Sequence, residues 1–402
     1  MANQIPFPKV ADLPVNANLP DPFTMWDGTP ITTPEQWMQQ RRPELKALFQ
    51  HYMYGFAPPP PGITADIRKF DTTVFGGKAT LKEIEIRFVG LPEDAPRINL
   101  ALFIPNQVTG PAPVFLALNH TGNYAVSPHP DVTFDPNAWV AEDWKDRIER
   151  GIHADFWAVE NTIDRGYAFA TFHESNIDPD QHDFDDGIHP YYPDLGVPDV
   201  ARWGTLAAWA WGLQRCVDYL VTDSAIDPER ICLTGHSRRG KTALLAAALD
   251  ERVALVAPHQ SGTGGCALSR DNDQETVWSI NDRFPHWFND VFPEFNGREA
   301  RLPFDQHLLV ALVAPRALID TEGIHDAWAS PLGAYRSLEA ADPVYKFLGT
   351  PGLLNLGMLQ GDDAINATTA GNLLQFRLDT AHMLNVDYWN AILDFADKTF
   401  AH

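Results

Sequence analysis

A serine lies in a stretch whose residue types suit a nucleophile: Gly235-His236-Ser237-Arg238-Arg239-Gly240-Lys241. The apolar run before it predicts a strand, and the alanine- and leucine-rich run after it predicts a helix that begins at once. A serine placed directly between a strand and a helix lies on a strained turn. This turn lifts the serine Oγ above the sheet and points the next backbone N–H at a developing oxyanion. The usual pattern is G-x-S-x-G, whereas here Gly240 falls one position late. Ser237 is the predicted nucleophile, and a plain helix N-cap is the alternative.

In folds that carry such a serine turn, the histidine that serves as general base comes after the serine along the chain. After the apolar run 316–322 the chain offers His325, His382 and the terminal His402. His382 directly precedes a stretch with helical apolar spacing, so we expect it in a loop that reaches back to Ser237. His382 is the predicted base, and a solvent-exposed loop histidine is the alternative.

An acid is needed to orient the imidazole and to stabilise its charged form. Asp326 lies just beyond the expected strand 316–322 and is the predicted acid. Glu322 and Asp379 remain as alternatives. Gln260 follows the preceding expected strand, where its amide can form hydrogen bonds but cannot supply a negative charge.

Short apolar runs alternate with helical patterns through most of the chain. Runs of this length, bounded by turn signals, are typical of buried parallel strands joined by right-handed crossovers; they lie at 112–120, 167–173, 230–236, 253–260 and 316–322. Two alternating segments, 81–90 and 98–106, suit antiparallel strands at the sheet edge. Helices are expected at 205–223, 241–250 and 388–400. The pattern predicts an α/β-hydrolase fold, a three-layer αβα sandwich around a mostly parallel sheet.

The chain is expected to form a single domain over residues 1–402. Residues 1–75 are rich in proline and are expected to form an N-terminal arm, with one helix near 35–54. The region 120–202 is polar and too long for a simple crossover. We expect part of it to be inserted over the carboxyl ends of the strands.

Composition limits the partners. The chain has 53 Asp and Glu against 30 Lys and Arg, a formal charge of −23, which repels nucleic acid and anionic membrane surfaces. Its three cysteines lie in apolar stretches and are expected to be buried and unpaired. We expect no cofactor, metal, membrane span or nucleic-acid partner, and a monomer. The compartment stays open: an export signal already removed would place the protein in the periplasm or outside the cell, and the alternative is the cytoplasm.

Taken together, these residues resemble the glucuronoyl esterases, carbohydrate esterase family 15, which cleave the ester between glucuronate on xylan and lignin alcohols. The similar segments run in order over about residues 200–400: 235–241, 258–270, 284–288, 314–316, 326–331 and His382. The resemblance implies that Ser237 and His382 are nucleophile and base. It also implies that Arg238 contributes to the oxyanion hole through its backbone and its guanidinium.

The resemblance further implies that Lys241, Glu275 and Trp328 contact the hydroxyls and the face of the glucuronate ring. Gln260 is counted with these substrate-binding residues. It stands where many members carry the catalytic glutamate, and this departure moves the acid role to Asp326. A second departure is His236, which replaces the cysteine of many members, and its side chain is expected to face away from the Ser237 Oγ.

The expected activity is two-step ester hydrolysis through an acyl-enzyme, with a glucuronate ester of glucuronoxylan and lignin as substrate. An acetyl xylan esterase or broad-specificity carboxylesterase with the same triad is the first alternative. A metal-dependent hydrolase is the second, suggested by the acidic loop His173-Glu174 and 178–186 with His182 and His189. A non-catalytic carbohydrate-binding protein that uses its 12 tryptophans is the third.

Overall fold

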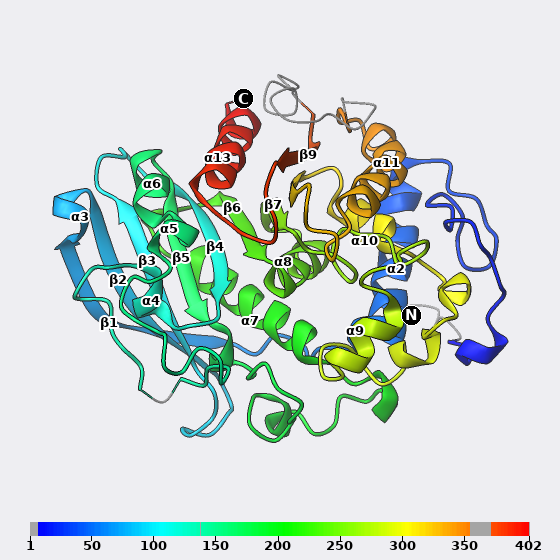
Figure 1. Cartoon of the computed structure of the whole chain (residues 1–402), viewed down its shortest axis with the longest axis horizontal. Helices are drawn as coiled ribbons and strands as arrows, with labels where there is room; N and C mark the ends of the chain where they lie inside the picture. Colours follow the sequence, from blue (N-terminus) through cyan, green and yellow to red (C-terminus); the bar gives the residue numbers. More distant parts are fainter. Residues whose placement is uncertain (1–6, 137, 354–370, 402) are drawn as a thin grey trace.

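The computed structural model describes residues 7–136, 138–353 and 371–401. One nine-stranded sheet runs through these residues in the order β1-β2-β3-β5-β4-β6-β7-β8-β9. Its strands are β1 (Ile63–Thr73), β2 (Ala79–Phe88), β3 (Ile98–Pro105), β4 (Ala112–Asn119), β5 (Ala168–His173), β6 (Ile226–His236), β7 (Val253–His259), β8 (Ala317–Gly323) and β9 (Leu373–Leu378). Figure 1 shows the sheet running from β1 at the left to β9 near the top.

Six neighbouring strands, from β5 through β9, are parallel, whereas β1, β2 and β3 pair antiparallel at one edge. The carboxyl ends of the parallel strands therefore meet at one edge of the sheet. The register brings three of them into line there, because His236 pairs with His259 and His259 pairs with Thr321.

Helices cover both faces of the sheet. The helical segments are α1 (Pro34–Gln36), α2 (Arg42–Phe49), α3 (Val74–Gly77), α4 (Asn123–Val126), α5 (Ala154–Trp157), α6 (Val159–Asp164), α7 (Thr205–Leu220), α8 (Arg238–Leu249), α9 (Val277–Arg283), α10 (Gln306–Val313), α11 (Pro331–Phe347) and α13 (Val386–Phe400). One core cluster joins α2, α7, α8, α10 and α11 to the sheet, and the other joins α5, α6 and α13 to its opposite face. The predicted three-layer α/β architecture is confirmed.

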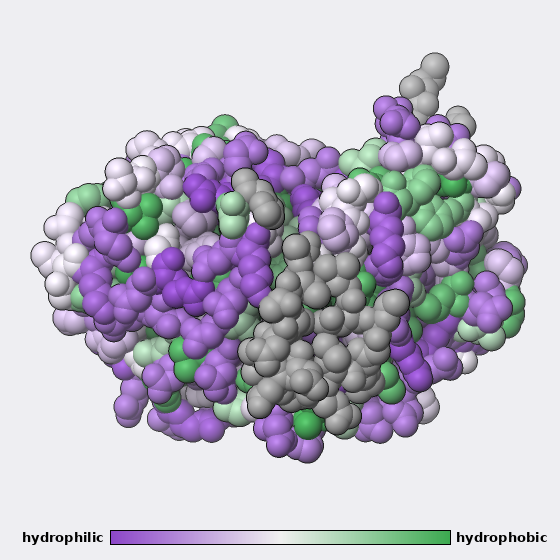
Figure 2. Space-filling model, turned by 90° about the horizontal axis from the view of Figure 1, so that it is seen from above, coloured by the Kyte–Doolittle hydropathy of each residue, from purple (hydrophilic) through white to green (hydrophobic). Residues whose placement is uncertain are grey.

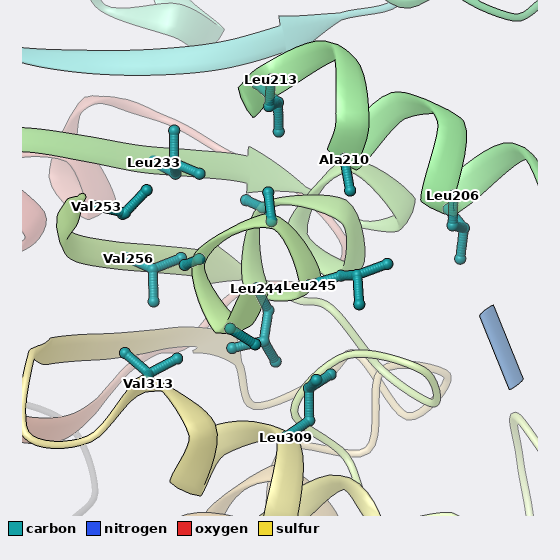
Figure 3. Packing of buried hydrophobic residues seen from close by; sticks show 14 of the residues in the cluster. Leu206, Ala210, Leu213, Leu233, Leu244, Leu245, Val253, Val256, Leu309 and Val313 are labelled. Atoms are coloured by element: carbon teal, nitrogen blue, oxygen red, sulfur yellow. The ribbon is translucent and has the colours of Figure 1, made fainter. Parts of the chain in front are cut away.

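The larger core shows why α8 is so rich in alanine and leucine. Leu244 and Leu245 of α8 lie between α7, the strands and α10 (Figure 3). Small side chains let α8 approach its neighbours closely, and the leucines fill the remaining space at the density of a protein interior. This packing holds the N-terminus of α8, where Ser237 lies, against the sheet.

The strands predicted from the short apolar runs are all present, and so are the two antiparallel strands. Residues 34–54 are helical throughout, as expected, with π-helical turns at Trp37–Arg41 and Gln50–Tyr54. Two strands were not predicted. β1 lies within the expected arm, and its mostly exposed side chains show no clear alternation of apolar and polar residues. β9 is six residues long and follows a segment outside the described residues.

The three cysteines are buried and free. Within the described ranges, no helix combines the length and the apolar character that a membrane span requires. On the face that Figure 2 shows, hydrophilic side chains predominate, with smaller hydrophobic areas between them.

Candidate active site

Ser237 lies on a strained turn between β6 and α8. Its backbone has φ 58° and ψ −127°, a conformation that non-glycine residues rarely adopt. The Ser237 N–H donates to the carbonyl of His259 at 2.8 Å, which ties the turn to the end of β7. Because α8 starts at Arg238, the N–H groups of its first turn have no acceptor within the helix. The N–H groups of Gly240 and Lys241 donate to the Ser237 carbonyl instead, at 2.8 and 3.1 Å. The turn therefore presents a hydroxyl next to the Arg238 N–H at the start of the helix, where acyl transfer requires a backbone donor.

Two glycines permit this turn. A Cβ on Gly235 would lie 2.3 Å from the Arg239 carbonyl oxygen, and a Cβ on Gly240 would lie 2.8 Å from the Gly235 carbonyl oxygen. The first turn of α8 thus packs directly on the end of β6, and only residues without a side chain fit at the contact. The late position of the second glycine follows from this contact.

His382 and Asp326 are in direct contact. His382 Nδ1 lies 2.5 Å from Asp326 Oδ2, and the side chains are 40% and 3% exposed. The His382 ring also lies beside that of His236, the residue before Ser237, with 4.4 Å between ring centroids. With Nδ1 bonded to the carboxylate, Nε2 is the nitrogen left to accept a proton. The expectation that the His236 side chain faces away from the Ser237 Oγ stays a prediction, and the contact adds that its ring touches the proposed base.

The alternative acids lie elsewhere. Asp379 accepts a hydrogen bond from His325 Nε2 at 2.5 Å on the surface. Glu322 is fully buried on β8, where burial and the neighbouring Asp320 raise its pKa well above the ordinary value. A carboxyl group that stays protonated cannot stabilise an imidazolium as a charge. Of the three acids considered, Asp326 alone is bonded to His382.

The Arg238 guanidinium is held in a fixed position. Its Cζ lies 4.7 Å from the centroid of the Phe284 ring and 4.4 Å from that of the Trp287 ring, two rings that stack on each other with centroids 3.7 Å apart, and the guanidinium donates to the carboxylate of Asp180. Asp180 also accepts from His286 Nε2 at 3.0 Å and from Trp287 Nε1 at 2.8 Å. Although burial raises the pKa of Asp180, Arg238 and these hydrogen bonds hold it well below its ordinary value. The positive charge next to Ser237 is therefore fixed by a permanently ionised partner.

Sequence reasoning missed Asp180. It lies 58 residues before Arg238, in the polar loop that we considered as a metal site, and nothing in its local spacing marks it. Arg239 is engaged in the same way, because its guanidinium donates twice to Glu174, at 2.5 and 2.7 Å. Arg238 and Arg239 thus attach the inserted region to the strained turn at Ser237.

Lys241, Glu275 and Trp328 lie together next to the strained turn at Ser237. Lys241 Nζ lies 3.1 and 3.0 Å from the two Glu275 oxygens and donates to the Thr263 carbonyl at 2.5 Å. Burial lowers the pKa of Lys241 and raises that of Glu275, while the opposite charges counteract both shifts, and a hydrogen bond from Trp328 also lowers the pKa of Glu275. The predicted ring-binding set is therefore one connected cluster, although its lysine and glutamate are almost fully buried.

Gln260 is bonded to the protein backbone. Its Nε2 donates to the Ala381 carbonyl at 2.8 Å, and its Oε1 accepts from the Met383 N–H at 2.9 Å. Only 1% of the residue is exposed. Its expected role in substrate binding stays a prediction, whereas the bonds that it makes are to both neighbours of His382.

The acidic loop has protein partners rather than an arrangement of ligands. Asp178 bonds His189 and Thr205, and Glu174 bonds Arg239. The single His, Cys, Asp and Glu set within metal-binding distance among the described residues is Asp71, His129 and Asp131, which lies at β1 and the loop after α4. The loop residues that suggested a metal-dependent hydrolase are therefore used to hold the loop.

The arrangement can perform acyl transfer: a strained hydroxyl, a backbone donor at a helix N-terminus, a fixed guanidinium and an imidazole oriented by a carboxylate share one sheet edge. A cavity of about 810 Å³ lies along β2, β3 and β5 and includes His173 and Asn176, but none of the candidate site residues lines it.

Comparison with known proteins agrees with this chemistry. A family model described as glucuronyl esterase, fungi, matches residues 152–349. A carbohydrate esterase from an unknown prokaryotic organism is 38% identical over 394 residues, which cover 94% of this chain and 89% of that protein. A 4-O-methyl-glucuronoyl methylesterase from Schizophyllum commune is 31% identical over 352 residues, covering 84% of this chain and 75% of that protein.

Solved structures agree as well. A promiscuous CE15 esterase from a marine bacterial metagenome has a TM-score of 0.87 at 37% identity, covering 98% of this chain and 99% of that chain. A glucuronoyl esterase from Solibacter usitatus has a TM-score of 0.86 at 33% identity, covering 97% of this chain and 100% of that chain. The chain belongs to the glucuronoyl esterases of carbohydrate esterase family 15 and is a carboxylic ester hydrolase.

Proposed function

We propose that the protein hydrolyses esters of glucuronate or 4-O-methyl-glucuronate through an acyl-enzyme on Ser237. His382 Nε2 takes the Ser237 proton while Oγ forms a bond to the ester carbonyl carbon. The Arg238 N–H and guanidinium stabilise the oxyanion. The ester C–O bond then breaks, and His382 returns the proton to the leaving alcohol. Water, deprotonated by His382, releases the sugar acid and regenerates Ser237.

The observation that carries this proposal is the 2.5 Å bond between His382 Nδ1 and Asp326 Oδ2, formed next to a strained serine. The carboxylate selects the tautomer of His382 whose Nε2 can accept a proton and stabilises the imidazolium that follows. An incidental ion pair at the surface would not be expected beside a strained serine turn. The combination therefore supports Asp326 as the acid of the triad.

The acyl side of the substrate is assigned from the cluster of Lys241, Glu275 and Trp328. An ammonium and a carboxylate supply donors and acceptors for sugar hydroxyls, and an indole stacks on the C–H face of a pyranose ring. The names of the relatives, among them 4-O-methyl-glucuronoyl methylesterases, support the same class of acyl group. The leaving alcohol would be a lignin alcohol on the natural polymer.

A second candidate is a broad-specificity carboxylesterase with the same triad. Two observations favour it: Lys241 and Glu275 already satisfy each other, and one similar structure is described as promiscuous. Trp328→Ala separates the two. On a benzyl glucuronate we expect kcat/KM to fall about tenfold, the value of one lost stacking contact, with little change on an aryl acetate. Equal losses on both esters would favour the broad-specificity enzyme.

The central test is release of glucuronate from a benzyl glucuronate by the native protein and by Ser237→Ala. We expect kcat to fall by about one million-fold in the variant, because it lacks the hydroxyl that forms the acyl-enzyme. Burst kinetics in the native protein would show that the intermediate accumulates. Turnover in Ser237→Ala close to that of the native protein would contradict the proposal.

A further inference from the structure

Three backbone atoms on either side of His382 are bound by two consecutive residues at the end of β7. His259 Nε2 donates to the Met383 carbonyl at 2.9 Å. Gln260 donates to the Ala381 carbonyl at 2.8 Å and accepts from the Met383 N–H at 2.9 Å. The peptide groups before and after His382 are therefore both fixed to the strand next to the one that carries Ser237.

To these backbone bonds the His382 side chain adds its own contacts with Asp326 and His236. Ala381, His382 and Met383 are exposed, and they lie between the end of β9 at Leu378 and the start of α13 at Val386. An exposed loop of this kind samples many backbone conformations unless hydrogen bonds restrict it. A general base must instead be held in one position, because a displacement of about 1 Å at the reacting groups can lower the rate about 100-fold.

His259 has only one tautomer that satisfies its surroundings. Its Nε2 faces a carbonyl and must carry the hydrogen, so Nδ1 accepts from the Thr321 hydroxyl, 2.8 Å away. The residue is fully buried, and burial lowers its pKa to about 3. The imidazole is therefore neutral, as this hydrogen-bond pattern requires.

Gln260 carries a strained backbone at the same place. Its φ is 47°, in the left-handed region, while its N–H donates to the Thr321 carbonyl at 2.9 Å. Such strain persists only where surrounding bonds compensate for it. Here it turns the side chain from the sheet edge toward Ala381 and Met383.

We propose that His259 and Gln260 are positioning residues that clamp the backbone around His382 and so hold its imidazole between Ser237 and Asp326. This inference rests on the proposed function, because it assigns His382 as the base. It explains why an amide stands at position 260. The position must donate to one peptide group and accept from another, which a neutral amide does and an ionised carboxylate cannot.

Gln260→Met tests the clamp by removing both bonds with a side chain of similar length. We expect kcat to fall about 100-fold with KM nearly unchanged, because positioning and not substrate affinity is lost. The far-downfield proton resonance of the short His382–Asp326 hydrogen bond should broaden or shift in the substrate-free variant. Gln214→Met is the matched control, since Gln214 Nε2 donates to the Ala246 carbonyl at 3.3 Å away from the site. We expect the control to keep the native kcat and resonance.

Gln260→Glu gives a second readout with a pH dependence. When the introduced carboxyl group is protonated, it can donate to Ala381 and accept from Met383, whereas its ionised form repels the Ala381 carbonyl. The ratio of variant to native kcat should therefore rise as pH falls. Among the described residues, the titratable groups that interact with His259 and its neighbours beside this position include His236 on β6, Glu322 on β8, Asp326 after β8, His382 after β9 and Tyr388 on α13.

The outcomes separate cleanly. Native kcat together with an unchanged resonance in Gln260→Met would overturn the clamp. So would a Gln260→Glu variant that is as active as the native protein or more active at high pH, since a carboxylate at 260 would then act as an acid. The kinetic measurements on Gln260→Met and Gln260→Glu can use any ester that the native protein hydrolyses. The proton resonance is recorded without substrate. Failure of the clamp can therefore be told apart from failure of the proposed substrate.

Discussion

The ring of His236 lies against that of His382, with centroids 4.4 Å apart and planes tilted by 46°. His236 in turn packs on His259, at 5.1 Å, and on Phe156, at 5.2 Å. Burial lowers the pKa of His236 well below its ordinary value, so its ring is neutral. A neutral aromatic ring beside the proposed base restricts its orientation without adding a competing charge.

His236→Ala should therefore lower kcat about tenfold, because an aromatic pair contributes about 1 kcal/mol and its loss frees the His382 ring. His236→Phe keeps a flat ring and should retain most of the activity. Steady-state kinetics of both variants on one ester provide the measurement. A His236→Phe variant as impaired as His236→Ala would show that the ring nitrogens, and not the stacking, matter.

Asp326→Asn should reduce kcat by about 10,000-fold, since the amide favours the wrong tautomer of His382 and supplies no charge for the imidazolium. Asp379→Asn is the matched control: its carboxylate pairs with His325 at the surface. We expect the control to keep native kinetics. A large loss in Asp379→Asn with normal turnover in Asp326→Asn would reassign the acid.

Asp180→Asn removes the charge that fixes Arg238. Since Asp180 and Arg238 are partly or largely buried, the free energy of unfolding should fall by about 3 kcal/mol, and kcat should fall with it. Asp199→Asn removes an acid that pairs with Arg202 but is 87% exposed, so it should cost less than about 1 kcal/mol. Urea titrations of both variants compare the two losses. Similar losses would mean that Asp180 has no special structural role.

The buried histidine His173 should make stability depend on pH. Burial lowers its pKa from 6.5 to about 4, so below pH 6.5 the unfolded chain binds a proton that the folded chain does not. The free energy of unfolding should therefore fall as pH falls, by about 1.4 kcal/mol per pH unit from this residue down to pH 4. The contribution is fully present above pH 6.5.

Urea unfolding of His173→Asn across pH 4–8 tests this sign, because the variant should show a shallower slope than the native protein. A His173→Asn slope equal to that of the native protein would show that folding does not lower the pKa of His173.

Several parts of the molecule could be predicted because they are encoded locally. Gly235, Ser237 and Gly240 lie within six positions, and the contact that requires both glycines forms inside the same turn. The parallel strands are short apolar runs, and burial on both faces is what makes them apolar. β1 and β9 escaped prediction because one is largely exposed and the other is short and mixed in character.

The sequence by itself determined the fold class, the strained serine turn and the set of residue types able to perform acyl transfer, since each depends on neighbours along the chain. Only the tertiary structure decided which partner each residue meets. Asp326 reaches His382 across 56 positions, Asp180 reaches Arg238 across 58, and Gln260 reaches Ala381 across 121. These pairs depend on which strand ends become neighbours at the sheet edge, and local side-chain patterns do not encode that order.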